Sequence, residues 1–214
     1  MLQRLTPRAE LLLVNLICFG PFAARSLIEL GNLRSVIVFD ESRALFILGI
    51  EIVCGTLAGL LLRARGWTPA KLGLRVSMPQ TIAGMLLLIG TNLFIAGFYE
   101  LVQVATGTDP GGATTPVTHM TWPVLIALTL INPLYDELFV VAYNIQASQN
   151  SGAAFAITLS AAIRFLCHLD QGPIAAVTIL PLGIIFALVY WRWRLVWPLV
   201  VAHGVMDFLG LMPG

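Results

Sequence analysis

Apolar segments long enough to cross a membrane dominate this sequence of 214 residues and limit its fold more than any other feature. A hydrocarbon core about 30 Å thick requires about 20 mostly apolar residues per helix. Only 11% of the residues are charged, whereas soluble domains have about 25%. The sequence therefore predicts an all-helical, polytopic transmembrane bundle of about seven segments (six to eight): Ala9–Ala24, Ala44–Leu62, Gln80–Val104, Thr121–Gln146, Ala153–His168, Pro173–Trp191 and Leu195–Met212.

The predicted bundle accounts for the whole chain as a single integral membrane domain, residues 1–214, with no visible repeat. The first and fifth segments are short, which suits a tilted or re-entrant helix. The N-terminus has the basic start, the apolar core and the small residues near Ala23 that a cleavable signal peptide would show. Because the rest of the chain is a membrane bundle in any case, we expect an uncleaved first helix.

Charge and cysteine content exclude several classes of protein. The net charge is +1, so no basic face for nucleic acid is expected. Three cysteines, Cys18, Cys54 and Cys167, lie in apolar segments at no metal-ligand spacing. We interpret them as small buried hydrophobic residues.

The distribution of Lys and Arg predicts the orientation in the membrane. The loop 63–75 has four cations and no acidic residue, so the positive-inside rule places it in the cytoplasm. Counting segments then places the N-terminus and Arg192 in the cytoplasm, and the loop 105–120, which has no Lys or Arg, outside. The connection 25–43 fits less well, because it holds three Arg on the predicted external side.

Six ionisable residues interrupt the apolar segments, although each costs about 2.5 to 3.5 kcal/mol at bilayer depth. They form three pairs on three segments: Asp136 and Glu137, Arg164 and His168, and His203 and Asp207. In each of the last two pairs the residues are four apart, so on helices each pair shares one face. The adjacent carboxylates are about 100° apart on a helix, which lets both border one interior seam.

The predicted depths of these residues are also similar. At about 1.5 Å per residue, Glu137, His203 and His168 lie about 12 to 20 Å from the cytoplasmic ends of their helices. Because three helices each bring polar groups to a similar depth, the sequence predicts one shared polar pocket. The alternative is that a buried His holds the bundle together by hydrogen bonding, which is common for a lone His. For Arg164 we expect the role of counter-charge to the carboxylates, since an unpaired buried cation is costly.

Two carboxylates and two imidazoles around a wet cavity match the requirements for activating water against a peptide carbonyl. A carboxylate takes the proton of the water, while His side chains donate hydrogen bonds to the oxyanion or hold a metal. Asp207 is placed to orient a His. The same residues are also compatible with a proton-coupled transporter. Glu51, on the second segment, favours that alternative unless it pairs with Arg164 or lines the same cavity.

Three motifs on these segments resemble those of the CAAX protease and bacteriocin-processing family of intramembrane endopeptidases. Pro133 followed by "DELF" (136–139) is similar to the family's Glu-Glu pair, "RFLCHLDQG" (164–172) to its second motif, and "WPLVVAHGVMD" (197–207) to its third. Upstream, "GWTPAKLGLR" (66–75) is similar to a loop of many bacterial members, so the resemblance covers roughly residues 66–207. All the motifs occur in the family's order.

Two departures from the family pattern concern the charges. Asp136 stands where the first Glu is expected, one methylene shorter. Val141 stands where an Arg usually follows the second Glu, while Arg164 stands where many members have Phe. A cation moved to a neighbouring helix can still face the same carboxylates, and we expect this exchange here.

The resemblance implies an endopeptidase that cleaves a membrane-associated protein or peptide. Glu137 and Asp136 would activate water, and His168, His203 and Asp207 would bind the water, a metal or the oxyanion. A divalent metal such as zinc, if present, would be held by His168, His203 and Glu137. The expected location is a prokaryotic plasma membrane, with the site opening to the cytoplasm. A catalytically silent member that acts as a scaffold or bacteriocin-immunity factor stays an alternative.

Overall fold

The described part of the chain is helical apart from its connections. A computed structural model describes residues 5–30, 38–107, 117–118, 120–169, 176–177 and 179–212. Its elements are α1 (Pro7–Leu30), α2 (Glu41–Ala64), α3 (Met78–Thr106), α4 (Trp122–Asp136), the π-helix η3 (Glu137–Tyr143), α5 (Asn144–Ser148), the 3-10 helix η4 (Gln149–Ser151), α6 (Ala153–Cys167), α8 (Leu180–Trp193) and α9 (Trp197–Leu211). Within these ranges the β-structure is one isolated bridge, Phe39 to Val117. The predicted all-helical fold is confirmed.

Some sequence predictions lie outside the described residues. These are the connection 31–37, most of the predicted external loop (108–116 and 119), residues 170–172 of the second motif and the start of the sixth segment at Pro173.

Four helical spans among the described residues are long and apolar enough to cross a membrane: Pro7–Glu29, Glu41–Ala64, Met78–Thr106 and Trp122–Ser151. The three remaining apolar helices, α6, α8 and α9, have 14 or 15 residues each. The chain is therefore an integral membrane protein.

The first helix is longer than the sequence pattern predicted, and the prediction of a short first segment is wrong. It continues to Leu30 because the charged residues beyond Ala24 are paired within the helix. Arg25 Nε lies 2.8 Å from Glu29 Oε1, one turn further on. An ion pair at this spacing supports helix and carries the segment past its apolar part.

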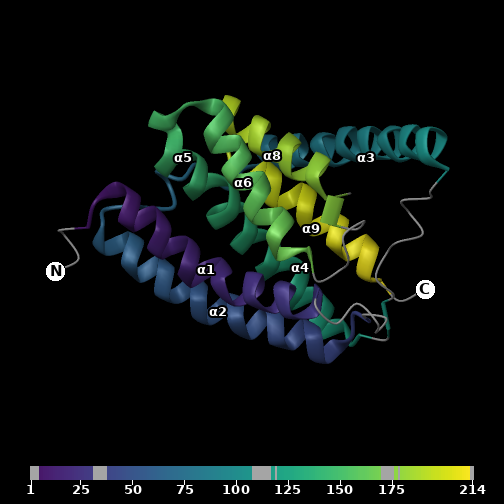
Figure 1. Ribbon diagram of the computed structural model, residues 1–214, viewed down its shortest axis with the longest axis horizontal. Coiled ribbons are helices and arrows are strands. Elements are labelled where there is room, and N and C mark those ends of the chain that lie inside the picture. The colour runs from purple at the N-terminus through teal and green to yellow at the C-terminus, as the bar shows by residue number, and fades with distance from the viewer. Residues whose placement is uncertain are drawn as a thin grey trace.

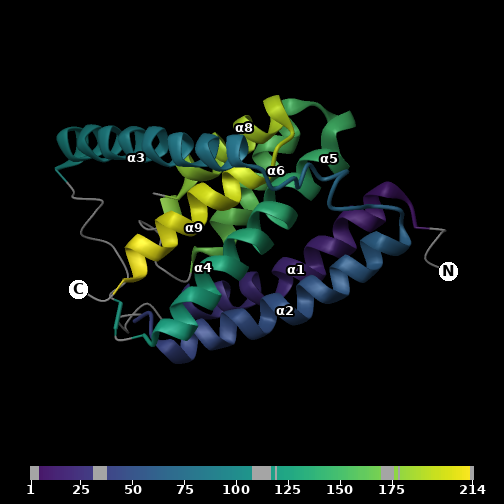
Figure 2. The same cartoon turned by 180° about the vertical axis from the view of Figure 1, so that it is seen from behind.

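The helices pack in a definite order across the bundle. Helices α1 and α2 form an antiparallel pair along one side, and α3 lies on the opposite side (Figure 1). Between them lie α4, α6, α8 and α9, with α4 in contact with both α2 and α9. The view from behind shows α3 against α9 at one end and projecting beyond it at the other (Figure 2).

The contact between α3 and α9 depends on a glycine. A Cβ atom on Gly84 would lie 2.7 Å from the Cβ of Val201 and 2.8 Å from the carbonyl oxygen of Pro198. No side chain fits at those distances, so the two helix backbones approach as closely as small residues allow in membrane proteins.

We expect Gly84→Val to destabilise the bundle by about 1 to 3 kcal/mol, because the added methyl groups force α3 away from α9. The matched control is Gly90→Val on the same helix, where a Cβ would meet nothing within 4 Å. Thermal unfolding midpoints in detergent would compare the two variants. Equal shifts would mean that the close approach does not contribute to stability.

The connection after α2 is held in place by contacts with α5 and with the end of α8. Tyr190 Oη donates to the carbonyl oxygen of Leu72 at 2.9 Å, and the side-chain amide of Gln146 bonds both Tyr190 and the carbonyl of Lys71. Gly73 has φ +80°, and a Cβ there would lie 2.0 Å from the carbonyl oxygen of Arg194. These contacts bring the end of α2, α5 and the end of α8 to one end of the bundle.

Candidate active site

Helix α4 ends at the acidic pair, and the chain continues from there as a π-helix. Pro133 lies inside the helix. Its nitrogen has no hydrogen, so it cannot donate to the carbonyl of Thr129 four residues earlier. Gly204 of α9 covers that carbonyl, since a Cβ on Gly204 would lie 2.8 Å from the Thr129 oxygen. Close approach of the two backbones at this point brings His203, the neighbour of Gly204, to the acidic pair.

Asp136 is the last residue of α4 and Glu137 is the first of the π-helix η3. The wider turns of a π-helix leave carbonyl groups to be satisfied by other donors. Asn144 supplies one, because its buried side-chain nitrogen donates to the carbonyls of Phe139 at 2.8 Å and Val140 at 3.3 Å. Asn15 of α1 donates in turn to the Asn144 side-chain oxygen at 2.7 Å. An amide pair between α1 and α5 therefore holds the π-helix in place.

We expect Asn144→Leu to lower the kcat of any reaction at this site at nearly constant KM, because the π-helix that carries Glu137 loses its side-chain donor. Buried carbonyls left unpaired cost about 1 to 3 kcal/mol. Asn92→Leu is the control, since the side chain of Asn92 donates within its own helix, to the carbonyl of Leu88 on α3. Equal kinetics in both variants would show that the amide pair does not position Glu137.

Glu137 is the centre of the candidate site. Its side chain is fully buried. Oε1 accepts a hydrogen bond from Arg164 Nη2 at 2.6 Å and lies 2.8 Å from His203 Nδ1. Oε2 is buried and has no hydrogen-bond partner among the described residues. One oxygen is therefore fixed by two helices, and the other has no partner within the described part of the chain.

Arg164 links the two adjacent carboxylates. Its guanidinium reaches Glu137 through Nη2, and Nη1 lies 3.6 Å from Asp136 Oδ2. Gly183 makes room for it, since a Cβ there would lie 3.2 Å from Arg164 Cδ. The ring of Phe186 lies 6.0 Å away, within the range of a cation–π contact. Arg164, on α6, thus faces both acids, Asp136 on α4 and Glu137 on η3. The cation that the family pattern places at position 141, where this chain has Val141, is supplied here by a neighbouring helix.

The two histidines have different environments. His203 lies between two carboxylates, with Nδ1 on Glu137 and Nε2 3.5 Å from Asp207 Oδ1. His168 follows the last residue of α6, and its Nδ1 lies 2.8 Å from the carbonyl oxygen of Arg164. A carbonyl only accepts, so Nδ1 of His168 carries the hydrogen and Nε2 of the neutral ring is an acceptor. His168 is also within electrostatic range of Asp136.

Glu51 joins the same region from α2. It is buried, and its Oε1 accepts a hydrogen bond from Asn132 Nδ2 at 2.5 Å. It interacts electrostatically with Asp136, His203 and Asp207. From the sequence, Glu51 was expected either to pair with Arg164 or to line the same cavity. In the structure its carboxylate accepts a hydrogen bond from Asn132 and not from Arg164.

The structure brings five of the six predicted residues together around one carboxylate, while His168 contacts the backbone carbonyl of Arg164. Glu137, Arg164 and His203 are in direct contact, while Asp136 and Asp207 flank them at 3.5 to 3.6 Å. Sequence reasoning missed the amide pair that supports them. The signal was present as two Asn residues within apolar helices, but nothing in their spacing indicated that they meet.

The zinc site of His168, His203 and Glu137 that was considered from the sequence stays a prediction. In the described ranges, no group of three or more His, Cys, Asp or Glu side chains is placed to hold a metal ion. Of the three predicted ligands, His203 has both ring nitrogens on carboxylates, 2.8 Å from Glu137 Oε1 and 3.5 Å from Asp207 Oδ1, so it would have to turn to bind a metal. We therefore assign no step of a reaction to a metal.

Comparison with known proteins adds the family. Residues 118–209 match a family model described as type II CAAX prenyl endopeptidase Rce1-like. No curated protein and no solved structure matches the chain significantly. The matched region runs through α4, α6, α8 and α9 and contains every site residue predicted from the sequence. This region, less than half of the chain, is thus similar to CAAX-type intramembrane proteases and supports the resemblance that the sequence motifs indicated.

Proposed function

We propose that this protein is an intramembrane endopeptidase in which Glu137 activates the water that attacks a peptide carbonyl. The observation that carries the proposal is the asymmetry of its carboxylate. Arg164 and His203 hold Oε1, whereas Oε2 is buried and has no hydrogen-bond partner among the residues that the structure describes. Buried polar atoms are nearly always hydrogen-bonded, and an exception at such a place calls for a functional explanation. A water molecule on Oε2 would satisfy it and would be positioned to lose a proton.

Each neighbouring group has a role in this reaction. Arg164 keeps the charge of Glu137 and Asp136 compensated while the proton moves. His203 is the hydrogen-bond donor that orients Glu137, and Asp207 holds the other side of its ring. His168, which follows α6 beside Arg164, is the residue predicted from the sequence to bind the water or the oxyanion. Asp136, which shares Arg164 with Glu137, has a side chain that is 14% exposed and is therefore more accessible to water than the buried Glu137.

The substrate class follows from the membrane location. A site assembled within helices that span a bilayer is reached most directly by a peptide that is itself held at the membrane. The family model that matches residues 118–209 names prenyl endopeptidases with the CAAX sequence. Peptides with a C-terminal CAAX sequence, with and without a prenyl group, are therefore the first substrates to test.

The test is cleavage of a peptide library by the purified protein in lipid vesicles, with products identified by mass spectrometry. We expect cleavage by the wild-type protein and none by Glu137→Gln. A parallel sample treated with a chelator reports on metal: loss of cleavage there would mean that the donors rearrange around an ion. Wild-type protein that cleaves no peptide in any lipid would reject the proposal and favour a silent family member.

A further inference from the structure

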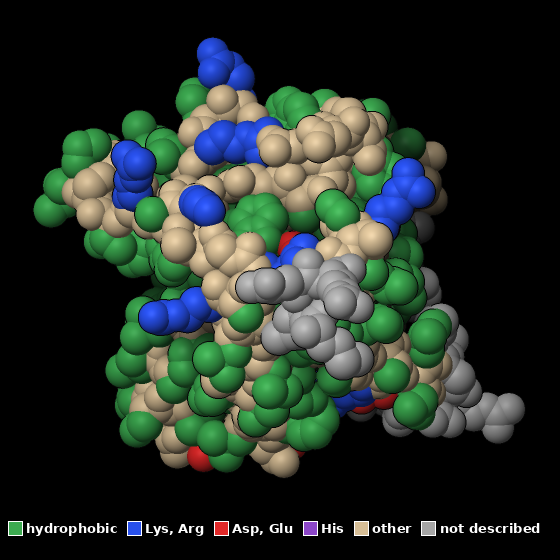
Figure 3. All heavy atoms as spheres, turned by 90° about the vertical axis from the view of Figure 1, so that its left-hand side faces the viewer, with side chains coloured by type: hydrophobic (Ala, Val, Ile, Leu, Met, Phe, Trp, Pro, Cys, Tyr) green, Lys and Arg blue, Asp and Glu red, His purple; other side chains and the backbone are tan. Residues whose placement is uncertain are grey.

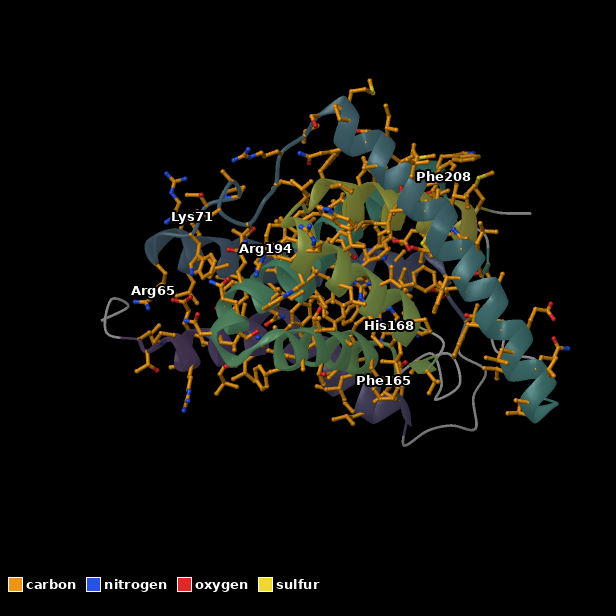
Figure 4. All side chains as sticks on the ribbon, turned by 90° about the horizontal axis from the view of Figure 1, so that it is seen from above. Arg65, Lys71, Phe165, His168, Arg194 and Phe208 are labelled. Atoms are coloured by element: carbon orange, nitrogen blue, oxygen red, sulfur yellow. The ribbon has the colours of Figure 1, made fainter. Side chains whose placement is uncertain are left out.

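A cavity at one end of the bundle is separate from the candidate active site. Its volume is about 340 Å³, and it is lined by Pro7, Glu10, Arg65, Gly66, Trp67 and Lys71. Arg65 and Lys71 lie together at one end of the molecule, whereas His168 lies well away from them (Figure 4). A cavity of this size is large enough for a small ligand or a lipid headgroup.

The inner wall of the cavity is fixed by a buried carboxylate. Glu10 accepts hydrogen bonds from Arg65 Nε at 2.5 Å and from Trp67 Nε1 at 2.8 Å. Tyr143 Oη lies 3.4 Å from the same carboxylate. Glu10 is 6% exposed, so its charge is balanced inside the protein by Arg65 and not by solvent. The wall is therefore preformed and electrically neutral before any ligand arrives.

The rim of the cavity carries the uncompensated charge. Lys71 Nζ donates to the carbonyl oxygen of Gly66 at 2.5 Å, and its side chain is exposed. An ammonium group has three N–H donors, so this bond leaves two directed outward. Gly66 has φ +82°, a backbone conformation that allows its carbonyl to turn towards Lys71.

The surroundings of the cavity are positive as well. Lys and Arg side chains gather on this face (Figure 3). Exposed cations here are Arg8, Arg63, Lys71, Arg75 and Arg192. The described segments that meet at this end, 5–10, 63–78, 144–152 and 190–196, contain one acidic residue, the buried Glu10. An anionic ligand is thus favoured by the whole end of the bundle.

The level of the cavity identifies the kind of anion. Helix α1 begins at Pro7 and the antiparallel α2 ends at Ala64, and both are long enough to span a membrane. The lining residues lie in the first turn of α1 or just beyond the end of α2, where the hydrocarbon core meets the headgroups. Trp67, with its amphipathic ring, is typical of this boundary. Lipid phosphates are concentrated at the same level.

We propose that this cavity binds the phosphate group of an anionic membrane lipid, with Lys71 as its principal ligand and Trp67 against the glycerol region. A free phosphate ion has the same chemistry but lacks the apolar part that Pro7 and Trp67 would contact. The proposal is independent of any peptidase activity.

Native mass spectrometry of the detergent-purified protein tests the proposal. The protein is titrated with phosphatidylglycerol, with phosphatidylcholine and with inorganic phosphate, and the bound fraction is measured. We expect phosphatidylglycerol to bind preferentially and Lys71→Gln to weaken it about fivefold, the effect of one cation near an anionic lipid surface. Lys71→Arg should retain binding. Arg75→Gln, an exposed cation on the same loop but outside the cavity, should leave binding near wild type.

The remaining outcomes would overturn the proposal. Equal binding of the two lipids would show that the phosphate charge is not recognised. Equal weakening by Lys71→Gln and Arg75→Gln would assign the effect to the general field of this face. Displacement of the lipid by millimolar inorganic phosphate would identify a free anion as the ligand. Circular dichroism of each variant checks that the exposed substitution leaves the helices intact.

Discussion

Glu137→Gln is expected to lower kcat for peptide cleavage by about 10²- to 10⁴-fold, the usual contribution of a general base. The folded bundle should remain, because Gln keeps an oxygen that accepts from Arg164 Nη2 and His203 Nδ1. What Gln cannot do is take a proton from water. Single-turnover cleavage of the best library peptide would measure the change.

The control for this variant is Glu29→Gln. Glu29 is also paired with an arginine, at 2.8 Å, but its side chain is 24% exposed and lies near the end of α1. We expect wild-type turnover there. Turnover at the wild-type rate in Glu137→Gln itself would mean that another group activates the water, and Asp136 would be the next residue to test.

Arg164→Met is expected to destabilise the protein by about 3 to 5 kcal/mol, the cost of leaving a buried charge without its partner. Arg164 is 1% exposed, and Glu137 beside it is fully buried. Met has a similar length and no charge, so the loss is electrostatic more than steric. Unfolding of the detergent-solubilised protein, followed by circular dichroism, would measure it.

Two further variants separate charge pairing from packing. Arg25→Met removes a partly exposed pair and should cost about 1 kcal/mol or less. The double variant Arg164→Met with Glu137→Gln should be less destabilised than the sum of the two single variants, because neither charge is then left alone. Additive effects would show that Arg164 does not stabilise Glu137.

Much of the fold could be predicted from the sequence because the bilayer imposes simple rules. Apolar length gave the helices, and spacing of four placed Arg164 with His168 and His203 with Asp207 on shared helix faces. The extension of α1 past Ala24 was missed, because it depends on the pairing of Arg25 with Glu29. A prediction from the length of an apolar segment counts apolar residues and takes no account of such ion pairs.

The detailed geometry of the site could not be predicted, because it depends on tertiary contacts. An ideal α-helix through the acidic pair was the natural expectation, but the chain forms a π-helix from Glu137 onward. Pro133 gives a local reason for irregularity. The stabilising partners, Gly204 and the Asn144–Asn15 pair, come from other helices. The hydrophobic periodicity of a single helix does not indicate such contacts.

The pairing of α1 with distant residues has a consequence for how the protein is made. Asn15 leaves the ribosome 129 residues before its partner Asn144. At about 5 to 20 residues per second, that delay is on the order of ten seconds. Glu10 waits a shorter time, since Arg65 follows 55 residues later. Helix α1 therefore gains its polar partners only after later helices are made, and until then its polar side chains depend on water, lipid headgroups or the insertion machinery.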